Sequence, residues 1–211
     1  MIDPASVTLI AVTFAASKVL HKMADDAVES LWAKAKKRLR AYLKQEPTPE
    51  ALTPEVVASA FADEPGSLTD LTDFYGRSVA LHRATIQRDL LDGARILWID
   101  DHPANNSWER RALEGFGAVF VTVETTASAI GVAGREKFDA VISDISRDVG
   151  DSGLAGLPAI SAATQGVPVV LYVGALNPGT PPGALGITND PEELIHLLLD
   201  ALGRTRCGRA V

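Results

Sequence analysis

Two short apolar runs that each end in aspartate constrain this chain more than any other feature. Arg95–Ile99 precedes the pair Asp100 and Asp101, and Ala140–Ser143 precedes Asp144. Short apolar runs between turn residues are typical of buried strands. Parallel strands of an open α/β sheet bind ligands beyond their carboxyl ends, so the three carboxylates form a candidate site. The alternative is that Asp100 and Asp101 only cap the helix that follows them.

Strands and helices alternate regularly between residues 94 and 203. Besides the two runs that end in aspartate, further strands are expected at Ala118–Val123, Val167–Val173 and Leu185–Thr188, with helices at Trp108–Phe116, from Thr125 or Thr126 to Ala133, at Leu154–Thr164 and at Glu192–Leu202. The run Val167–Val173 is continuously apolar, as a central parallel strand should be. This alternation predicts an α/β fold, with a parallel sheet covered by helices on both faces.

Residues 1–93 are expected to be helical and to contribute no catalytic group. Residues 1–46 are predicted to form one long amphipathic helix or a helical hairpin, which Pro47 ends. Residues 47–93 are a proline-punctuated helical linker region, with a short helix at Glu55–Phe61 and one or two more helices at residues 67–91. The basic tail, residues 204–211, is expected to be disordered.

Charge and cysteine content exclude several classes of protein. A net charge of −7 argues against bulk attraction to nucleic acid, although a basic run with six bases and no acids extends from Lys34 to Lys44. The single cysteine, Cys207, excludes an intrachain disulfide and a cysteine-built zinc site. Val7–Leu20 lacks a basic segment before it and is too short to span a bilayer. These features predict a cytoplasmic location.

Residues 94–203 resemble the response-regulator receiver domain, the phosphoacceptor module of bacterial signalling. The most specific parts of the resemblance are Ile99-Asp100-Asp101 and Val141-Ile142-Ser143-Asp144. The resemblance implies a flavodoxin-like (CheY-like), doubly wound, five-stranded parallel sheet. It also implies that Asp144 is the phosphoacceptor, and that Asp100, Asp101, Asp144 and the carbonyl of Ser146 bind Mg²⁺.

The chemistry of three converging carboxylates agrees with this assignment. Their mutual repulsion raises pKa values, and a hard divalent cation such as Mg²⁺ relieves it through oxygen ligands. A carboxylate beside such an ion can attack a phosphoryl donor. His102 is interpreted as a loop residue, because the sequence places no nucleophile beside it.

The chain departs from the receiver pattern in the half of the site that holds the phosphoryl group. Receivers have Ser or Thr at the end of the fourth strand, where this chain has Val173. They have Lys near the end of the fifth strand, but Ile187–Pro191, which includes Asn189, contains none. Thr180 or Thr188 offers only a weak substitute. The proline- and glycine-rich stretch Gly174–Ala184 predicts that the fourth helix is shortened or missing.

The favoured hypothesis is therefore a signalling or adaptor protein with an atypical receiver, used as a protein-interaction module, in which phosphorylation of Asp144 is doubtful. The N-terminal helix would bind a protein partner or form a homodimer. One alternative is a Mg²⁺-dependent phosphotransfer or phosphohydrolase enzyme with Asp144 as the nucleophile. Another is a peripheral membrane protein that uses Val7–Leu20 and the basic run Lys34–Lys44.

Overall fold

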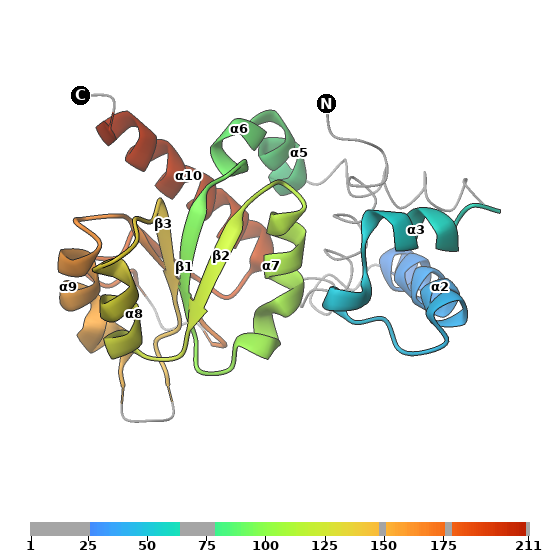
Figure 1. The fold of residues 1–211 in the computed structure, drawn as a ribbon, viewed down its shortest axis with the longest axis horizontal. Coiled ribbons are helices and arrows are strands. Elements are labelled where there is room, and N and C mark those ends of the chain that lie inside the picture. Colours follow the sequence, from blue (N-terminus) through green and yellow to red (C-terminus); the bar gives the residue numbers. More distant parts are fainter. Residues whose placement is uncertain (1–25, 64–78, 148–150, 176–178, 210–211) are drawn as a thin grey trace.

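The chain folds around one parallel sheet. The computed structural model describes residues 26–63, 79–147, 151–175 and 179–209, so the predictions for Val7–Leu20 and for residues 67–78 lie outside the described residues. The strands are β1 (Arg95–Ile99), β2 (Val119–Val123), β3 (Ala140–Ser143), β4 (Val169–Tyr172) and β5 (Gly186–Thr188). All neighbouring strands are parallel, in the order β2-β1-β3-β4-β5 (Figure 1). This order confirms the predicted flavodoxin-like fold class.

Helices cover both faces of the sheet (Figure 1). On one face lie α7 (Ser107–Glu114) and α10 (Pro191–Arg209), and on the other lie α8 (Thr126–Ala133) and α9 (Gly153–Ala163). Successive residues of β1 point to opposite faces, so that Ile96 and Trp98 join the first core while Leu97 and Ile99 join the second. Each strand therefore buries side chains on both faces, as the continuous apolar runs predict.

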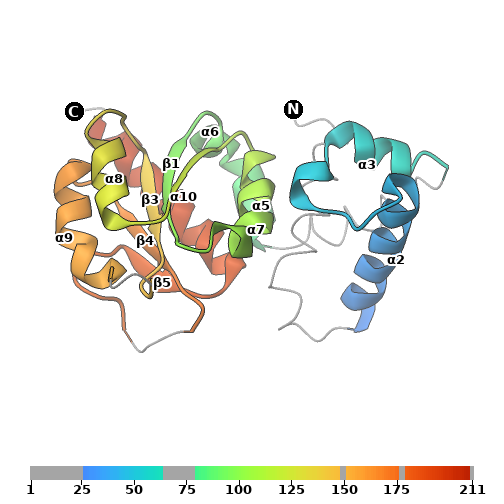
Figure 2. The ribbon, with the colours of Figure 1, turned by 60° about the horizontal axis from the view of Figure 1, so that its bottom comes forward.

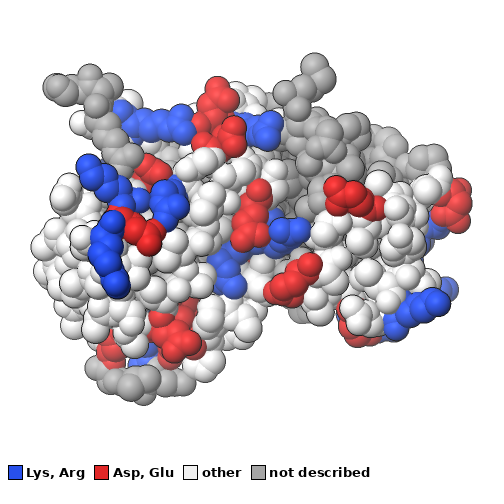
Figure 3. Space-filling model, viewed as in Figure 1, with Lys and Arg blue, Asp and Glu red and all other residues white. Residues whose placement is uncertain are grey.

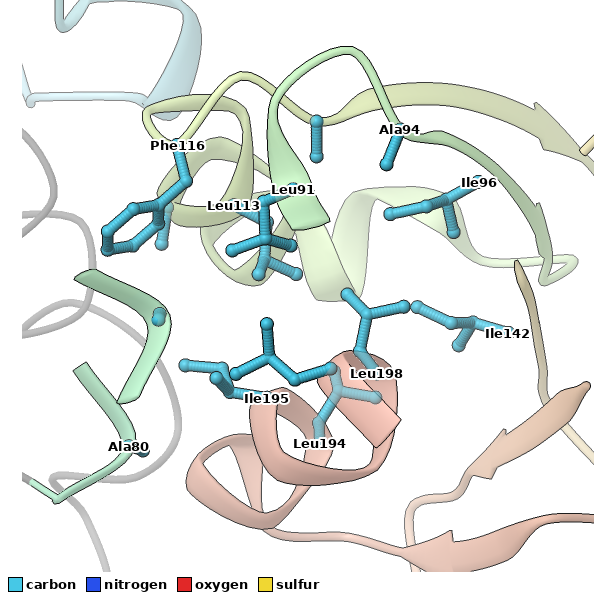
Figure 4. Packing of buried hydrophobic residues seen from close by; sticks show 14 of the residues in the cluster. Ala80, Leu91, Ala94, Ile96, Leu113, Phe116, Ile142, Leu194, Ile195 and Leu198 are labelled. Atoms are coloured by element: carbon cyan, nitrogen blue, oxygen red, sulfur yellow. The ribbon is translucent and has the colours of Figure 1, made fainter. Parts of the chain in front are cut away.

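The core beneath α10 includes helices that precede the sheet in the chain. Leu91 and Leu113 lie opposite Leu194, Ile195 and Leu198 (Figure 4). Two short helices, α5 (Val79–Ile86) and α6 (Arg88–Leu91), pack against α10. The segment that we expected to be part of a linker therefore belongs, from residue 79 onward, to the core of the receiver-like domain.

A second helical unit contacts α7 from the side (Figure 2). It consists of α2 (Asp26–Leu43), the 3₁₀ turn η2 (Pro49–Ala51) and α3 (Pro54–Ala60). The hydroxyl of Thr53 accepts a bond of 3.3 Å from the amide of Val56 and caps α3, as the Thr-Pro pair predicts. Buried Leu39 and Leu52 belong to the same core cluster as Leu113.

The last helix is longer than the sequence pattern suggests. It begins after Asp190, whose Oδ1 accepts a bond of 2.8 Å from the amide of Glu192, and it continues to Arg209. Residues 204–209 are thus helical, although we expected a disordered tail. One reason is that the hydroxyl of Thr205 donates to the carbonyl of Asp139 at 2.7 Å and fixes the helix to the chain before β3.

The connection between β4 and β5 contains no helix in its described residues, 173–175 and 179–185. The predicted loss of the fourth helix is therefore confirmed for these residues. Proline and glycine explain it, because Pro181, Pro182 and Gly183 disfavour helix. Among the helices of the described ranges, none combines the length and hydropathy that crossing a bilayer requires.

Candidate functional site

Three aspartates meet at the carboxyl end of the sheet. In the register of β1 and β3, Ile99 is the partner of Ser143, so the next residues, Asp100 and Asp144, leave the sheet side by side. Asp100, Asp101 and Asp144 each offer a carboxylate oxygen, and these oxygens lie within 4.8 Å of one another. Figure 3 shows acidic side chains gathered at this lower edge of the molecule, towards which β2 runs in Figure 1. We call these three residues the acid cluster.

Asp100 serves both the cluster and the loop that follows. Its buried carboxylate accepts a bond of 2.7 Å from the amide of His102 and one of 2.5 Å from the side-chain amide of Asn106. These bonds hold the 3₁₀ turn η3 (Pro103–Asn106), which leads into α7. Asp100 therefore holds the loop that leads into α7 without bonding to the first amides of that helix. Because each carboxylate oxygen has two lone pairs, these bonds are compatible with its predicted role as a metal ligand.

Asp101 is less accessible than its neighbour in the loop. Its side chain is 9% exposed, whereas that of His102 is 58% exposed. The Nδ1 atom of His102 lies 3.2 Å from an Asp101 oxygen. His102 lies in the loop between β1 and η3, in agreement with its interpretation as a loop residue.

The backbone that follows β3 orients Asp144. Its Oδ1 accepts a bond of 2.7 Å from the amide of Ile145 and a longer one of 3.4 Å from that of Ser146. Burial raises the pKa of Asp144, and the charges of Asp100 and Asp101 raise it further, although the two backbone bonds act in the opposite direction. Carboxylates that raise one another's pKa in this way form a candidate site for a cation, which would offset their repulsion.

The donor set of the acid cluster suits Mg²⁺. Carboxylate oxygens are the ligands that this hard cation prefers, and it usually takes only a few from the protein and keeps several waters. Asp100, Asp101 and Asp144 would hold the ion. The carbonyl of Ser146 stays a predicted fourth ligand, and the amide of that residue already bonds to Asp144.

The described ends of β4 and β5 lack the free hydroxyl and the lysine with which a receiver would hold a phosphoryl group. Val173 follows β4 and has no polar side-chain atom. The hydroxyl of Thr188, at the end of β5, accepts a bond of 2.9 Å from the amide of Asp190 and donates to its carbonyl at 3.3 Å. It is therefore used in starting α10. The sequence contains no lysine after Lys137, so no lysine can come from β5 or its loop.

Our reading of the sequence missed Arg147, three residues after Asp144. Its side chain is only 1% exposed, although it belongs to a loop, and it pairs with Asp151 at 2.6 Å. The spacing of an arginine and an aspartate, four residues apart between β3 and α9, was the signal that could have found it. The glycine-rich stretch Gly150–Gly156 reads in the sequence as a flexible loop beside the acids, but Gly153 is in close contact with them: a Cβ on it would lie 2.0 Å from the carbonyl oxygen of Asp144.

The fold is identified by the strand order β2-β1-β3-β4-β5 together with the acid cluster beyond the ends of β1 and β3. The fold is receiver-like. No protein-family model and no curated protein sequence matches the chain. Among solved structures, it is similar to a response regulator from Burkholderia pseudomallei with a phosphorylated aspartic acid, at 21% identity and a TM-score of 0.46, over 56% of this chain and 73% of that one.

Two further solved structures bracket the extent of the likeness. The receiver domain of the sensor histidine kinase PA1611 from Pseudomonas aeruginosa, with a magnesium ion in its active-site cleft, has 22% identity and a TM-score of 0.45, over 53% of this chain and 98% of that domain. The response regulator PhyR from Brucella abortus has 17% identity and a TM-score of 0.49, over 99% of this chain and 95% of that one. These values are low, and the assignment of the fold rests on the sheet order.

Proposed function

We propose that this chain is a signalling adaptor whose receiver-like domain binds Mg²⁺ at the acid cluster and serves as a protein-interaction module, without a phosphorylation switch. One observation carries the proposal. Three carboxylates lie together at the ends of β1 and β3, whereas the ends of β4 and β5 supply neither an available hydroxyl nor a lysine.

Free energy argues against a stable phosphoryl group on Asp144. Hydrogen bonds to charged groups contribute about 1.5–3 kcal/mol each. Val173 cannot make one, and the hydroxyl of Thr188 is already bonded to the backbone of Asp190. An aspartyl phosphate would therefore lack the two contacts that could couple it to β4 and β5, and its formation would not reorganise these strands.

The residues around the cluster would position the cation rather than perform a reaction. The amide of Ile145 holds Asp144, and the amides of His102 and Asn106 hold Asp100. Bound Mg²⁺ would supply positive charge that offsets the repulsion among the carboxylates. The ion would thereby stabilise the loops after β1 and β3, and a partner could recognise the resulting surface.

The proposed partner surface is the outer face of α2. Lys34, Lys37 and Lys44 are exposed and form no ion pair within the described part of the chain. Lys36 and Arg40 both pair with the carboxylate of Glu46, which offsets one of their two positive charges. Such a face suits an acidic protein partner, because complementary charge speeds and orients association. A homodimer through this helix is less favoured, since it would bring like charges together.

The decisive experiment compares metal binding with phosphoryl-analogue binding. Mn²⁺, a spectroscopic substitute for Mg²⁺, should bind to the intact protein and be lost in Asp144→Ala. Beryllofluoride with Mg²⁺ should leave the amide NMR spectrum as Mg²⁺ alone does, and acetyl phosphate should add no mass. A stable beryllofluoride complex that shifts resonances of β4 and β5 would contradict the absence of a switch. Hydrolysis of a phosphomonoester that is lost in Asp144→Ala would instead favour the alternative function, a Mg²⁺-dependent phosphohydrolase.

A further inference from the structure

Arg147 is a buried cation directly behind the acid cluster. Its guanidinium donates four hydrogen bonds: to Asp151 at 2.6 Å, to the hydroxyl of Thr126 at 2.9 Å, to that of Ser143 at 2.7 Å and to the carbonyl of Asp144 at 3.1 Å. The hydroxyl of Ser143 in turn donates to the same Asp144 carbonyl at 2.9 Å. One side chain therefore joins the end of β3, the first turn of α8 and the loop before α9.

Asp151 balances the charge of Arg147. Burial raises the pKa of Asp151, but hydrogen bonds from the amide and the hydroxyl of Thr126, together with the charge of Arg147, outweigh that effect and lower its pKa. The Asp151 oxygens lie 2.6 and 2.8 Å from these two Thr126 atoms. Asp151 neutralises the guanidinium of Arg147. Arg147 therefore affects the acid cluster mainly by holding the backbone in place and less by its charge.

Residues 151–153, which Arg147 contacts through Asp151, lie tightly against the backbone of Asp144. The amide of Gly153 donates to the carbonyl of Ile145 at 2.9 Å, and Ser146 and Ser152 form an isolated antiparallel bridge. A Cβ on Gly153 would lie 2.8 Å from the Arg147 guanidinium as well as 2.0 Å from the Asp144 carbonyl. The chain from residue 143 to residue 146 therefore has little freedom as long as Arg147 stays in place.

We propose that Arg147 is the positioning residue of the acid cluster: it fixes the backbone from which Asp144 and the Ser146 carbonyl are presented to a divalent cation. The proposal rests on the proposed function for the identity of that ligand. A planar guanidinium is suited to the task, because its fork of donors can bond the backbone, two hydroxyls and a carboxylate at once. A lysine ammonium has three donors on a flexible stem and cannot reproduce this arrangement.

The test measures Mn²⁺ affinity in Arg147→Met, Arg147→Lys and a control, Arg95→Met. Arg95 pairs with Glu136 and lies at the opposite end of β1, so its loss also removes an ion pair from the same sheet. Loss of a group that orients a metal ligand typically weakens affinity 10- to 100-fold. We expect such a loss in Arg147→Met, a smaller one in Arg147→Lys and less than a twofold change in Arg95→Met, each at a temperature where circular dichroism shows full folding.

Unchanged Mn²⁺ affinity in folded Arg147→Met would overturn the proposal and leave the metal site standing. If Arg147→Met does not fold, Asp151→Asn serves instead, and a weakening of at least threefold is expected because the carboxylate that anchors Arg147 has become a neutral amide. Absence of Mn²⁺ binding to the unaltered protein would remove the proposed function.

If no Mn²⁺ binds, amide hydrogen exchange tests whether Arg147 fixes the backbone at Ile145 and Ser146. Faster exchange confined to Ile145 and Ser146 in Arg147→Met would support it. Exchange that is accelerated equally at Leu97 and Ile142, in the centre of the sheet, would overturn it, because such a change reports a general loss of stability.

Discussion

Asp144 is the residue on which the acid cluster depends most. Its environment lowers the stability of the metal-free protein. Its pKa is raised by burial first and then by Asp100 and Asp101. The stability that its neutral form contributes is present below the unfolded-state pKa and is lost as the pH rises through the higher pKa of the folded state. At neutral pH the ionised Asp144 therefore destabilises the protein in the absence of a cation.

Asp144→Asn should consequently stabilise the metal-free protein at pH 7, by about 1 kcal/mol at most. The gain should shrink towards pH 3, where the wild-type carboxyl is protonated as well. Urea unfolding in the presence of a chelator measures both values, and Asp89→Asn, at an exposed position of α6, is the matched control. In excess Mg²⁺ the wild type should instead be more stable than Asp144→Asn. A variant that is less stable than the wild type at pH 7 without metal would contradict this account.

Tyr172 provides a second pH-dependent contribution at the residue scale. Burial raises its pKa, and the nearby Glu109, whose carboxylate lies 3.3 Å from the Tyr172 hydroxyl, raises it further. The folded state therefore keeps this proton, whereas the unfolded state releases it above a pH of about 10. The stability that Tyr172 contributes is present below that pH and declines above it.

We expect Tyr172→Phe to lower the free energy of unfolding by about 1–2 kcal/mol at pH 7, because Glu109 loses a buried donor. The loss should be smaller at pH 10.5. Tyr42→Phe, at an exposed position of α2, should change stability by less than about 0.5 kcal/mol at pH 7. Chemical denaturation at the two pH values measures the difference, and an equal cost at both would exclude the proton linkage.

The three aspartates of the acid cluster could be predicted from the sequence, but the groups that orient them could not. Asp100, Asp101 and Asp144 follow apolar runs, and the period of a strand is enough to place them at one edge. The role of Arg147 depends on contacts with Thr126, far away in the sequence, and on burial in a loop that reads as polar. Thr188 was a weak candidate in the sequence, and only the course of the chain at Asp190 shows that its hydroxyl is already bonded.

Among the elements, the loop between β3 and α9 sets the geometry of the site. Strands and most helices could be predicted to within a few residues, because hydrophobic period and Thr or Ser caps act locally. The close approach of this loop to β3 could not be predicted, because a glycine at position 153 is equally compatible with a flexible loop. Its Cβ position, 2.0 Å from the Asp144 carbonyl, shows that the glycine is required by a tight contact.

Gly153→Ala should therefore move the loop and lower the free energy of unfolding by about 1–3 kcal/mol, the usual cost of overpacking. Mn²⁺ affinity should fall with it, because the displaced atom is the backbone of Asp144. Gly174→Ala is the matched control, since a Cβ there meets nothing within 4 Å. Urea unfolding and Mn²⁺ titration of both variants measure these effects. Equal stability of the two variants would mean that the loop adapts at no cost.

At the scale of the whole molecule, as far as the structure describes it, the helical unit and one face of the sheet share a single buried cluster. Ala35, Leu39 and Phe61 belong to the same buried cluster as Leu113 and Leu198. The hydrophobic pattern predicted an amphipathic helix or hairpin over residues 1–46, of which the structure describes α2, Asp26–Leu43. The pattern could not show which surface covers the apolar face of this helix, because every exposed apolar stripe is an equally good candidate. The side of α7 that meets this unit is specified by polar contacts between parts distant in sequence.

Arg111 is the contact through which this connection can be tested. Its guanidinium donates to the carbonyl of Leu52 at 2.6 Å and thereby links α7 to the turn between α2 and α3. Arg111→Met should leave that carbonyl without its charged donor, and we expect a loss of about 1–2 kcal/mol. Amide exchange should accelerate at residues 35–61 and much less in β1 and β3, because their hydrogen bonds do not involve this side chain.

Arg135→Met is the matched control for this exchange experiment. Arg135 bonds to the carbonyl of Gly131 within its own helix region, and that contact is exposed, so no selective change at residues 35–61 is expected. If Arg111→Met accelerates exchange equally in the helical unit and in the sheet, the two parts open together and the core behaves as one cooperative unit. If neither part changes, the apolar contacts of Leu39 and Phe61 hold the unit in place without Arg111.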